Sequence, residues 1–245
     1  MTARFICIGT HHKSGMIWMR KVFRAIANQQ GIPFMQYYRA KRLIDLAETG
    51  PHIVVNRSSS FPQQRLDMPE ARFLHIIRDL REEKAEWGDK NYQDHLNAMQ
   101  DDHTRLMFAM ENKHDKTVGE MLKWPYGHKG AADIKYEDLI EDTDCAIFRG
   151  ILEKFDIEGL DIDKAVQSYW DKSLFGGLAK KDDRTDRVAL HVASGKKAQW
   201  VTKLRCEIAE PYADRYPEAL KTLDYADNSD WVAQCLPAKD IETAA

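Results

Sequence analysis

Short apolar runs alternate along the chain with segments of helical character. Three apolar runs predict strands at residues 5–8, 52–56 and 71–77, and two further short strands are expected at 131–136 and 33–37. The segments between and after them predict helices at residues 17–27, 39–48, 96–110, 118–124, 145–155, 163–170 and 200–216. This alternation indicates an α/β fold of three layers, with a central parallel sheet covered on both faces.

Three parts of the chain depart from this pattern. Residues 176–197 begin with a glycine pair and carry a charged run, which leaves a solvated surface loop and a functional lid as alternatives. Pro211 is expected to kink or split the helix at 200–216. The tail after about residue 227 is expected to be partly disordered, although it contains Trp231. Because no linker or repeat interrupts the chain, we expect a single domain over residues 1–245.

The charge balance argues against two classes of binding protein. The chain has 36 Lys and Arg against 39 Asp and Glu, a net charge of −3, which argues against general binding of nucleic acids or anionic membranes.

The apolar runs and the cysteines indicate the compartment. No apolar run approaches the roughly 18 residues of a membrane span, and a strand begins almost at once, where a signal peptide would lie. The four cysteines are scattered without a C-x-x-C pair, and no metal-ligand cluster is visible. We therefore expect a cytoplasmic protein with free thiols and no metal site.

The residues after the first strand carry the candidate chemistry. His11, His12, Lys13, Ser14 and Gly15 join a strand to a helix, and unpaired backbone N–H groups at a helix start favour phosphate binding. The lysine adds charge, and the glycine allows close backbone approach. The order differs from a Walker A motif, in which glycine directly precedes the lysine. A strand–turn–helix whose lysine binds nothing is the structural alternative.

This loop, with Trp18 three residues after Gly15, resembles the P-K-S-G-T-T-W loop of the PAPS-dependent sulfotransferases. Three further segments follow in the family's order. Residues 73–81, ending in Arg-Asp-Leu-Arg, are similar to its R-[DN]-P-[RK] element. Residues 134–142 resemble its R-Y-E-D-L element, and 194–200 keep the glycine-to-tryptophan spacing of its R-K-G-x-x-G-D-W segment. The resemblance covers nearly the whole chain and implies the P-loop nucleotide-kinase-like sulfotransferase fold.

The resemblance also implies roles for individual residues toward PAPS, whose product is PAP. Lys13 would contact the oxygen that bridges the sulfate and the 5′-phosphate. Arg78 would bind the 3′-phosphate, and Tyr136 would lie beside the adenine unless it is a buried core residue. Trp18 would stack on the adenine, with core packing as its alternative. The remaining cofactor contacts would come from the amides of Ser14, Gly15, Met16, Ile17 and Trp18 at the 5′-phosphate, and from Ser194, Gly195 and Lys196 at the 3′-phosphate.

Several positions depart from the family pattern. Met16 and Ile17 replace two threonines, which removes two hydroxyl contacts to the 5′-phosphate and predicts weaker binding. Glu86 stands where the family has a serine on the 3′-phosphate, and residues 193–194 replace an Arg-Lys pair. Ser60 stands where many relatives carry the histidine that serves as general base. His11, His12 and Glu86 are candidate substitutes, and a purely structural role is the alternative for each.

The predicted function is a sulfotransferase (EC 2.8.2 type) that moves the sulfuryl group of PAPS to a hydroxyl or amine by in-line transfer, without a metal. The acceptor, a small molecule, glycan or peptide, is not identified by the sequence, and neither is the oligomeric state, with a homodimer among the options. One alternative is a catalytically impaired PAP- or nucleotide-binding module of the same fold. Another is a small-molecule P-loop kinase, which the missing Walker A motif disfavours.

Overall fold

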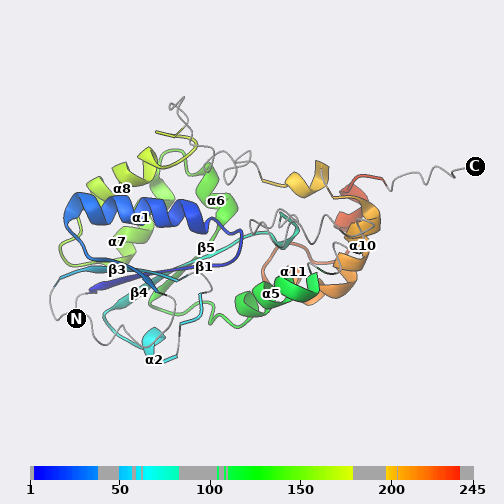
Figure 1. Cartoon of the computed structure of the whole chain (residues 1–245), viewed down its shortest axis with the longest axis horizontal. Helices are drawn as coiled ribbons and strands as arrows, with labels where there is room; N and C mark the ends of the chain where they lie inside the picture. The colour runs from blue at the N-terminus through cyan, green and yellow to red at the C-terminus, as the bar shows by residue number, and fades with distance from the viewer. Residues whose placement is uncertain are drawn as a thin grey trace, which may run out of the picture. The chain divides into compact units, whose positions relative to one another are not determined.

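The chain divides into two compact units in the computed structural model, which describes residues 3–37, 50–56, 59–61, 63–82, 104, 108, 110–178, 197–202 and 204–237 (Figure 1). Unit 1 comprises Met1–Arg78 and Lys123–Gly195, and unit 2 comprises Asp79–Leu122 and Lys196–Ala245. No helix among the described residues has the length and apolar character that crossing a membrane requires.

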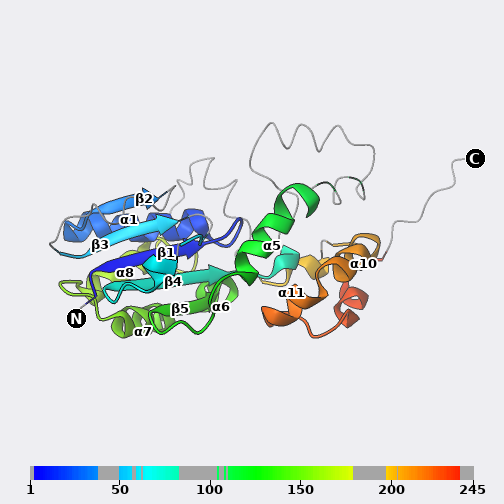
Figure 2. The same cartoon turned by 90° about the horizontal axis from the view of Figure 1, so that it is seen from below.

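Unit 1 is built on a five-stranded sheet in which every pair of neighbouring strands is parallel. Its strands are β1 (Phe5–Thr10), β2 (Phe34–Tyr37), β3 (His52–Asn56), β4 (Ala71–Ile77) and β5 (Ala131–Lys135). They lie in the order β2-β3-β1-β4-β5, which Figure 2 shows side by side. The predicted α/β fold with a central parallel sheet is therefore confirmed, with β1 at the centre.

Both faces of this sheet are covered. Unit 1 contains α1 (Met16–Gln30), α2 (Gln63–Leu66), α6 (Tyr136–Glu141), α7 (Ala146–Phe155) and α8 (Ile162–Asp171). Helices α1, α7 and α8 bury one face, in a core that includes Ile6, Phe23 and Phe148 (Figure 1). On the other face, Cys7 and Phe73 pack with residues of α2 and with Trp124. Alternate side chains of the buried strands thus enter two separate cores.

Unit 2 is a set of short helices around a buried arginine. Its elements are η2 (Leu80–Glu82), the π-helix η3 (Met110–His114), α5 (Asp115–Leu122), η4 (Gln199–Thr202), α10 (Cys206–Arg215), α11 (Pro217–Thr222) and η5 (Asp230–Gln234). The Arg81 guanidinium lies 4.1 Å from the ring centroid of Trp200 and 5.2 Å from that of Trp231. It also forms a bidentate pair with Asp79, with Nη2 2.7 Å from Oδ2. Cation–π contacts and a paired charge therefore hold η2, η4 and η5 together.

The strands at 52–56 and 71–77 match the prediction, but several boundaries differ. The strand expected to end at Tyr136 ends at Lys135, and Tyr136 begins α6. The helix expected at 118–124 starts earlier and ends at Leu122, so that Trp124 lies outside it. The helices expected at 39–48 and 96–110 fall almost wholly outside the described residues, as do residues 179–196 of the expected loop or lid.

The C-terminal part corrects two expectations. Helix α10 continues through Pro211, and the segment predicted as one helix is interrupted earlier, before Cys206. The physical reason is a short parallel bridge between Arg205 and Leu236, which holds the chain extended there. The cysteine's amide donates to the Leu236 carbonyl oxygen at 2.8 Å. The tail after about residue 227 was expected to be partly disordered, and its described residues, up to 237, belong to unit 2, with Trp231 buried.

Candidate functional site

The predicted phosphate loop lies where the direction of the strand connections reverses. From β1 the chain proceeds through α1 to β2 and β3 on one side of β1, whereas β4 and β5 lie on its other side. In open parallel sheets, ligands bind beyond the carboxyl ends of the strands at such a switch point. The loop at residues 11–15 leaves β1 at this point, and Arg78 follows β4 directly. The fold thus brings together two of the segments predicted to bind the cofactor.

The loop is stabilised by its own polar groups. The Ser14 hydroxyl donates to the His11 carbonyl oxygen at 2.9 Å and accepts from the His11 amide at 2.7 Å. The Ser14 amide also bonds to that carbonyl, at 3.2 Å. Lys13 and Gly15 both adopt positive φ, at 61° and 81°. Ser14 therefore shapes the loop from inside, and its amide is used within it.

The start of α1 presents the partial positive charge of a helix N-terminus. The first hydrogen bond of the helix runs from the Met19 amide to the Gly15 carbonyl oxygen, so that the preceding amides of Met16, Ile17 and Trp18 have no intrahelical acceptor. No side chain of the described residues caps this end, and the first turn contains no acidic residue. The helix dipole and these amides suit an anion. Met16 and Ile17 are half-buried, and the backbone donors at this position do not depend on the missing threonine hydroxyls.

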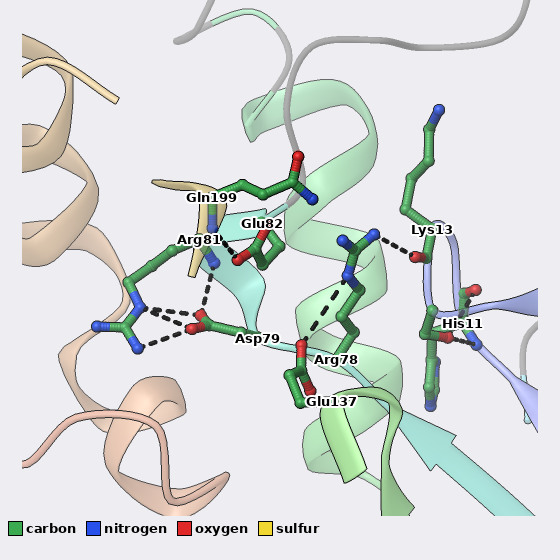
Figure 3. Close-up of polar contacts among 9 residues, drawn as sticks. His11, Lys13, Arg78, Asp79, Arg81, Glu82, Glu137 and Gln199 are labelled. Atoms are coloured by element: carbon green, nitrogen blue, oxygen red, sulfur yellow. Dashed lines mark hydrogen bonds and ion pairs between the residues drawn. The ribbon is translucent and has the colours of Figure 1, made fainter. Parts of the chain in front are cut away.

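Arg78 links β4 to the loop. Its Nη1 donates to the Lys13 carbonyl oxygen at 3.0 Å, and its Nε lies 3.9 Å from Oε1 of Glu137, a distance typical of an ion pair (Figure 3). The guanidinium also lies 4.8 Å from the ring centroid of Tyr136. In Figure 3 the Lys13 side chain extends away from the loop, opposite to the ring of His11. Arg78, Lys13 and Tyr136 therefore lie around one loop.

The two predicted aromatic residues lie against the start of α1. Tyr136 packs so closely that a Cβ on Gly15 would be 2.7 Å from its Cδ2. Its ring meets Trp18 edge-on, with centroids 6.0 Å apart. Trp18 in turn stacks on Tyr169, at 5.4 Å and an interplanar angle of 26°. One face of Trp18 is thus covered by Tyr169, whose position in α8 gave no sequence signal of proximity to the loop.

A buried row of polar side chains lies beneath the loop and was not predicted. His11 and His75 share a hydrogen bond between their Nε2 atoms, 2.8 Å apart. The Nδ1 of His75 is 3.1 Å from Oδ1 of Asp133. His11 is fully buried in this row, whereas His12 is half-buried in the loop. The available signal was a single histidine within the apolar strand at 71–77, because a buried polar side chain requires a partner.

The environment of this row lowers two pKa values. Burial lowers the pKa of His75, against the opposing effects of the hydrogen bond and charge of Asp133. Burial alone would raise the pKa of Asp133, but hydrogen bonds from His75 and the Gly127 amide, with a further one from Trp124, outweigh it and lower the pKa. His75 is therefore neutral and Asp133 ionised near neutral pH.

The remaining predicted residues lie outside the described residues. These are Ser194, Gly195, Lys196 and Glu86, together with the replaced pair at 193–194. Among the residues that the structure does describe, no group of three or more His, Cys, Asp or Glu side chains is arranged to hold a metal ion. The described part of the site therefore consists of the loop, the start of α1, Arg78 and Tyr136.

Comparison with solved structures identifies the fold. The mouse sulfotransferase SULT7A1, solved in complex with PAP, matches 94% of this chain over 88% of its own, with a TM-score of 0.62 and 13% sequence identity. A retinol dehydratase, solved with androsterone and the inactive cofactor PAP, matches 90% of this chain over 82% of its own, with a TM-score of 0.51 and 11% identity. No protein-family model matches the sequence, and no curated protein matches it significantly. The predicted sulfotransferase fold is therefore confirmed.

Proposed function

Because the chain has the sulfotransferase fold, we propose that it is a sulfotransferase that uses PAPS as its sulfuryl donor, with the whole chain acting as one functional domain. The observation that carries the proposal is the loop at residues 11–15, which ends at an uncapped helix start at the switch point of the sheet. Lys13, in the same loop, would supply an ammonium group to a bound phosphate. Such a site suits a phosphate whose neighbouring bond is to be broken.

The described residues would bind PAPS at both of its phosphate positions. The amides of Met16, Ile17 and Trp18 would bind the 5′-phosphate, and Tyr136 would lie beside the nucleoside. Arg78 would take the 3′-phosphate, for which its planar guanidinium supplies several donors. Its present bond to the Lys13 carbonyl oxygen places it next to the loop. When bound, PAPS supplies the sulfuryl group, and the residues of this chain supply positioning and charge.

Transfer requires charge stabilisation at one oxygen. A bond forms between sulfur and the acceptor hydroxyl oxygen or amine nitrogen while the bond from sulfur to the bridging oxygen breaks, and the electron pair remains on the 5′-phosphate. Lys13 would neutralise that oxygen as its charge grows. The acceptor proton passes to a base, for which His12, half-buried in the loop, is the better placed of the two loop histidines, because His11 is fully buried and bonded to His75.

Ligand binding tests the donor class. Thermal unfolding of the full chain is measured with PAP, ATP and GDP, since a ligand held only by the folded state raises its stability. We expect PAP to give the largest increase in Tm. A larger shift with ATP would favour a kinase, and no shift with PAP would contradict the proposal.

Transfer of labelled sulfate from PAPS to a panel of hydroxyl and amine acceptors tests the enzyme itself. Lys13→Ala should reduce transfer about 100-fold or more, because it removes the charge at the leaving oxygen. The matched control is Lys221→Ala, which truncates an exposed lysine of α11. Equal turnover in Lys13→Ala and the control would exclude the proposed role. Binding of PAP by the wild type without transfer to any acceptor would indicate the impaired module instead.

A further inference from the structure

The polar row Asp133–His75–His11 runs from β5 across β4 to the loop that follows β1, on the sheet face that contains the apolar core around Phe73. Residues 75 and 133 are register partners on β4 and β5, and residue 75 is the register partner of Gly9 on β1, two positions before His11. On the same face Phe73 and Cys7 belong to an apolar core. Burying polar groups here costs free energy unless each is bonded, so the row requires an explanation beyond packing.

The donors around Asp133 determine where the protons lie. Its Oδ1 accepts from Trp124 Nε1 at 2.6 Å, and its Oδ2 accepts from the Gly127 amide at 3.1 Å. An ionised carboxylate only accepts, so the Nδ1 of His75 must carry a proton toward it. A neutral His75 then has an unprotonated Nε2. The proton between the two imidazoles therefore belongs to Nε2 of His11, which fixes the tautomer of that ring.

The orientation of the His75 ring is fixed as well. It is fully buried and stacks on Trp124, with centroids 4.1 Å apart and an interplanar angle of 20°. The ring of Tyr126 meets it edge-on at 5.6 Å. Held by Asp133 at one nitrogen and by these rings at its faces, His75 presents a rigid acceptor to His11.

The row ends on the residue that begins the loop. The backbone N–H and carbonyl of His11 are the groups that Ser14 bonds, so a displacement of His11 would move the turn that precedes Gly15. We infer that Asp133 and His75 are positioning residues, which fix the tautomer and ring position of His11 and through it the phosphate loop. This inference deepens the proposed function and rests on it for the ligand.

The proton arrangement is tested first in the ligand-free full chain. Long-range ¹H–¹⁵N correlation spectra of protein labelled with ¹⁵N-histidine distinguish protonated from unprotonated ring nitrogens. We expect His75 to be protonated at Nδ1 and His11 at Nε2. The Asp133→Asn variant can turn its amide N–H₂ toward His75, and we expect it to lose this pattern. A wild-type spectrum with the protons on the other nitrogens would overturn the inference.

PAP affinity tests the effect on the loop. By isothermal titration, His75→Gln and Asp133→Asn should bind PAP about tenfold more weakly than the wild type. The matched control is His52→Gln, because His52 is a buried histidine of β3 bonded to the Gly50 carbonyl oxygen, away from the loop. Unchanged affinity in folded Asp133→Asn would overturn the inference, and that variant decides the question if His75→Gln does not fold. Failure of the wild type to bind PAP would instead contradict the proposed function, while the spectra still report on the row.

Discussion

Arg78 donates a hydrogen bond from Nη1 to the carbonyl oxygen of Lys13, across 3.0 Å. The residue proposed to bind the 3′-phosphate is therefore already bonded to the backbone of the residue proposed to stabilise the leaving oxygen. Lys13 has a positive φ of 61°, a conformation that costs free energy for a residue with a side chain. A charge-assisted bond to its carbonyl offsets part of that cost. The two halves of the proposed donor site are coupled through this contact.

The contact predicts a measurable difference between two ligands. Arg78→Lys removes the planar donor group and should weaken binding of PAP by about tenfold or more. AMP lacks the 3′-phosphate, so its affinity should fall much less, and the ratio of the two affinities should decrease. Isothermal titration measures both. Arg149→Lys, at an exposed ion pair with Asp163, is the control. If the affinities for PAP and AMP fell equally, Arg78 would stabilise the loop without contacting the 3′-phosphate.

Gly15 is predicted to tolerate no side chain. Its φ of 81° disfavours L-residues, and an added Cβ would lie 2.7 Å from Tyr136. Gly15→Ala should therefore lower the free energy of unfolding by about 2–4 kcal/mol and weaken PAP binding. Gly31→Ala is a matched control at the other end of α1, with a φ of 68° and nothing within 4 Å of the added Cβ. Urea unfolding should show that Gly31→Ala lowers the free energy of unfolding by only about 1 kcal/mol. Equal losses of unfolding free energy in the two variants would show that the Tyr136 ring moves aside without cost.

His75 predicts a pH dependence of stability. Burial lowers its pKa below the ordinary value of 6.5, so the unfolded chain binds the proton at a higher pH than the folded chain. Stability is then fully present above about pH 6.5 and declines as the pH falls. Among the residues that the structure describes, the charged or titratable groups in contact with His75 are Asp133, His11 and Tyr126. Urea unfolding between pH 5 and 8 should show this slope, and His75→Gln should flatten it. An equal slope in both proteins would contradict the assignment.

Unit 2 should depend on Arg81. Its pair with Asp79 is almost fully buried, and its Nη2 also donates to the Tyr225 carbonyl oxygen at 3.0 Å. Arg81→Ala leaves a buried carboxylate without its partner and should cost about 3–5 kcal/mol. Arg149→Ala, at a surface pair, should cost under about 1 kcal/mol. Urea unfolding followed by tryptophan fluorescence compares them. Similar losses of unfolding free energy in the two variants would show that the contacts of Arg81 do not stabilise unit 2.

Local patterns in the sequence were sufficient for the central part of the fold. The strands at 52–56 and 71–77 are continuous apolar runs between turn residues, and the structure reproduces them. The loop from His11 to Gly15 could be recognised because its residues are consecutive. Arg78 and Tyr136 were assigned to the same site by the resemblance to the sulfotransferase motifs, and the structure shows that each follows a strand that ends at the edge of the sheet where the loop lies.

Contacts that depend on register and packing could not be predicted in this way. The row from Asp133 to His11 exists only because β5, β4 and β1 align with one another, a relationship that no single segment encodes. Likewise, Tyr169 reaches Trp18 from α8, far along the chain. The pairing of Arg205 with Leu236 was missed for the same reason, and it explains why the start of α10 was predicted wrongly.

A crystal structure of the full chain grown with PAP would show directly whether the loop holds the donor. We expect the 5′-phosphate to lie on the amides of Met16, Ile17 and Trp18, with the Lys13 ammonium within hydrogen-bond distance of its terminal oxygens. The 3′-phosphate should lie at Arg78. PAP bound at another place, or a loop that holds no phosphate at saturating PAP, would exclude the proposed donor site.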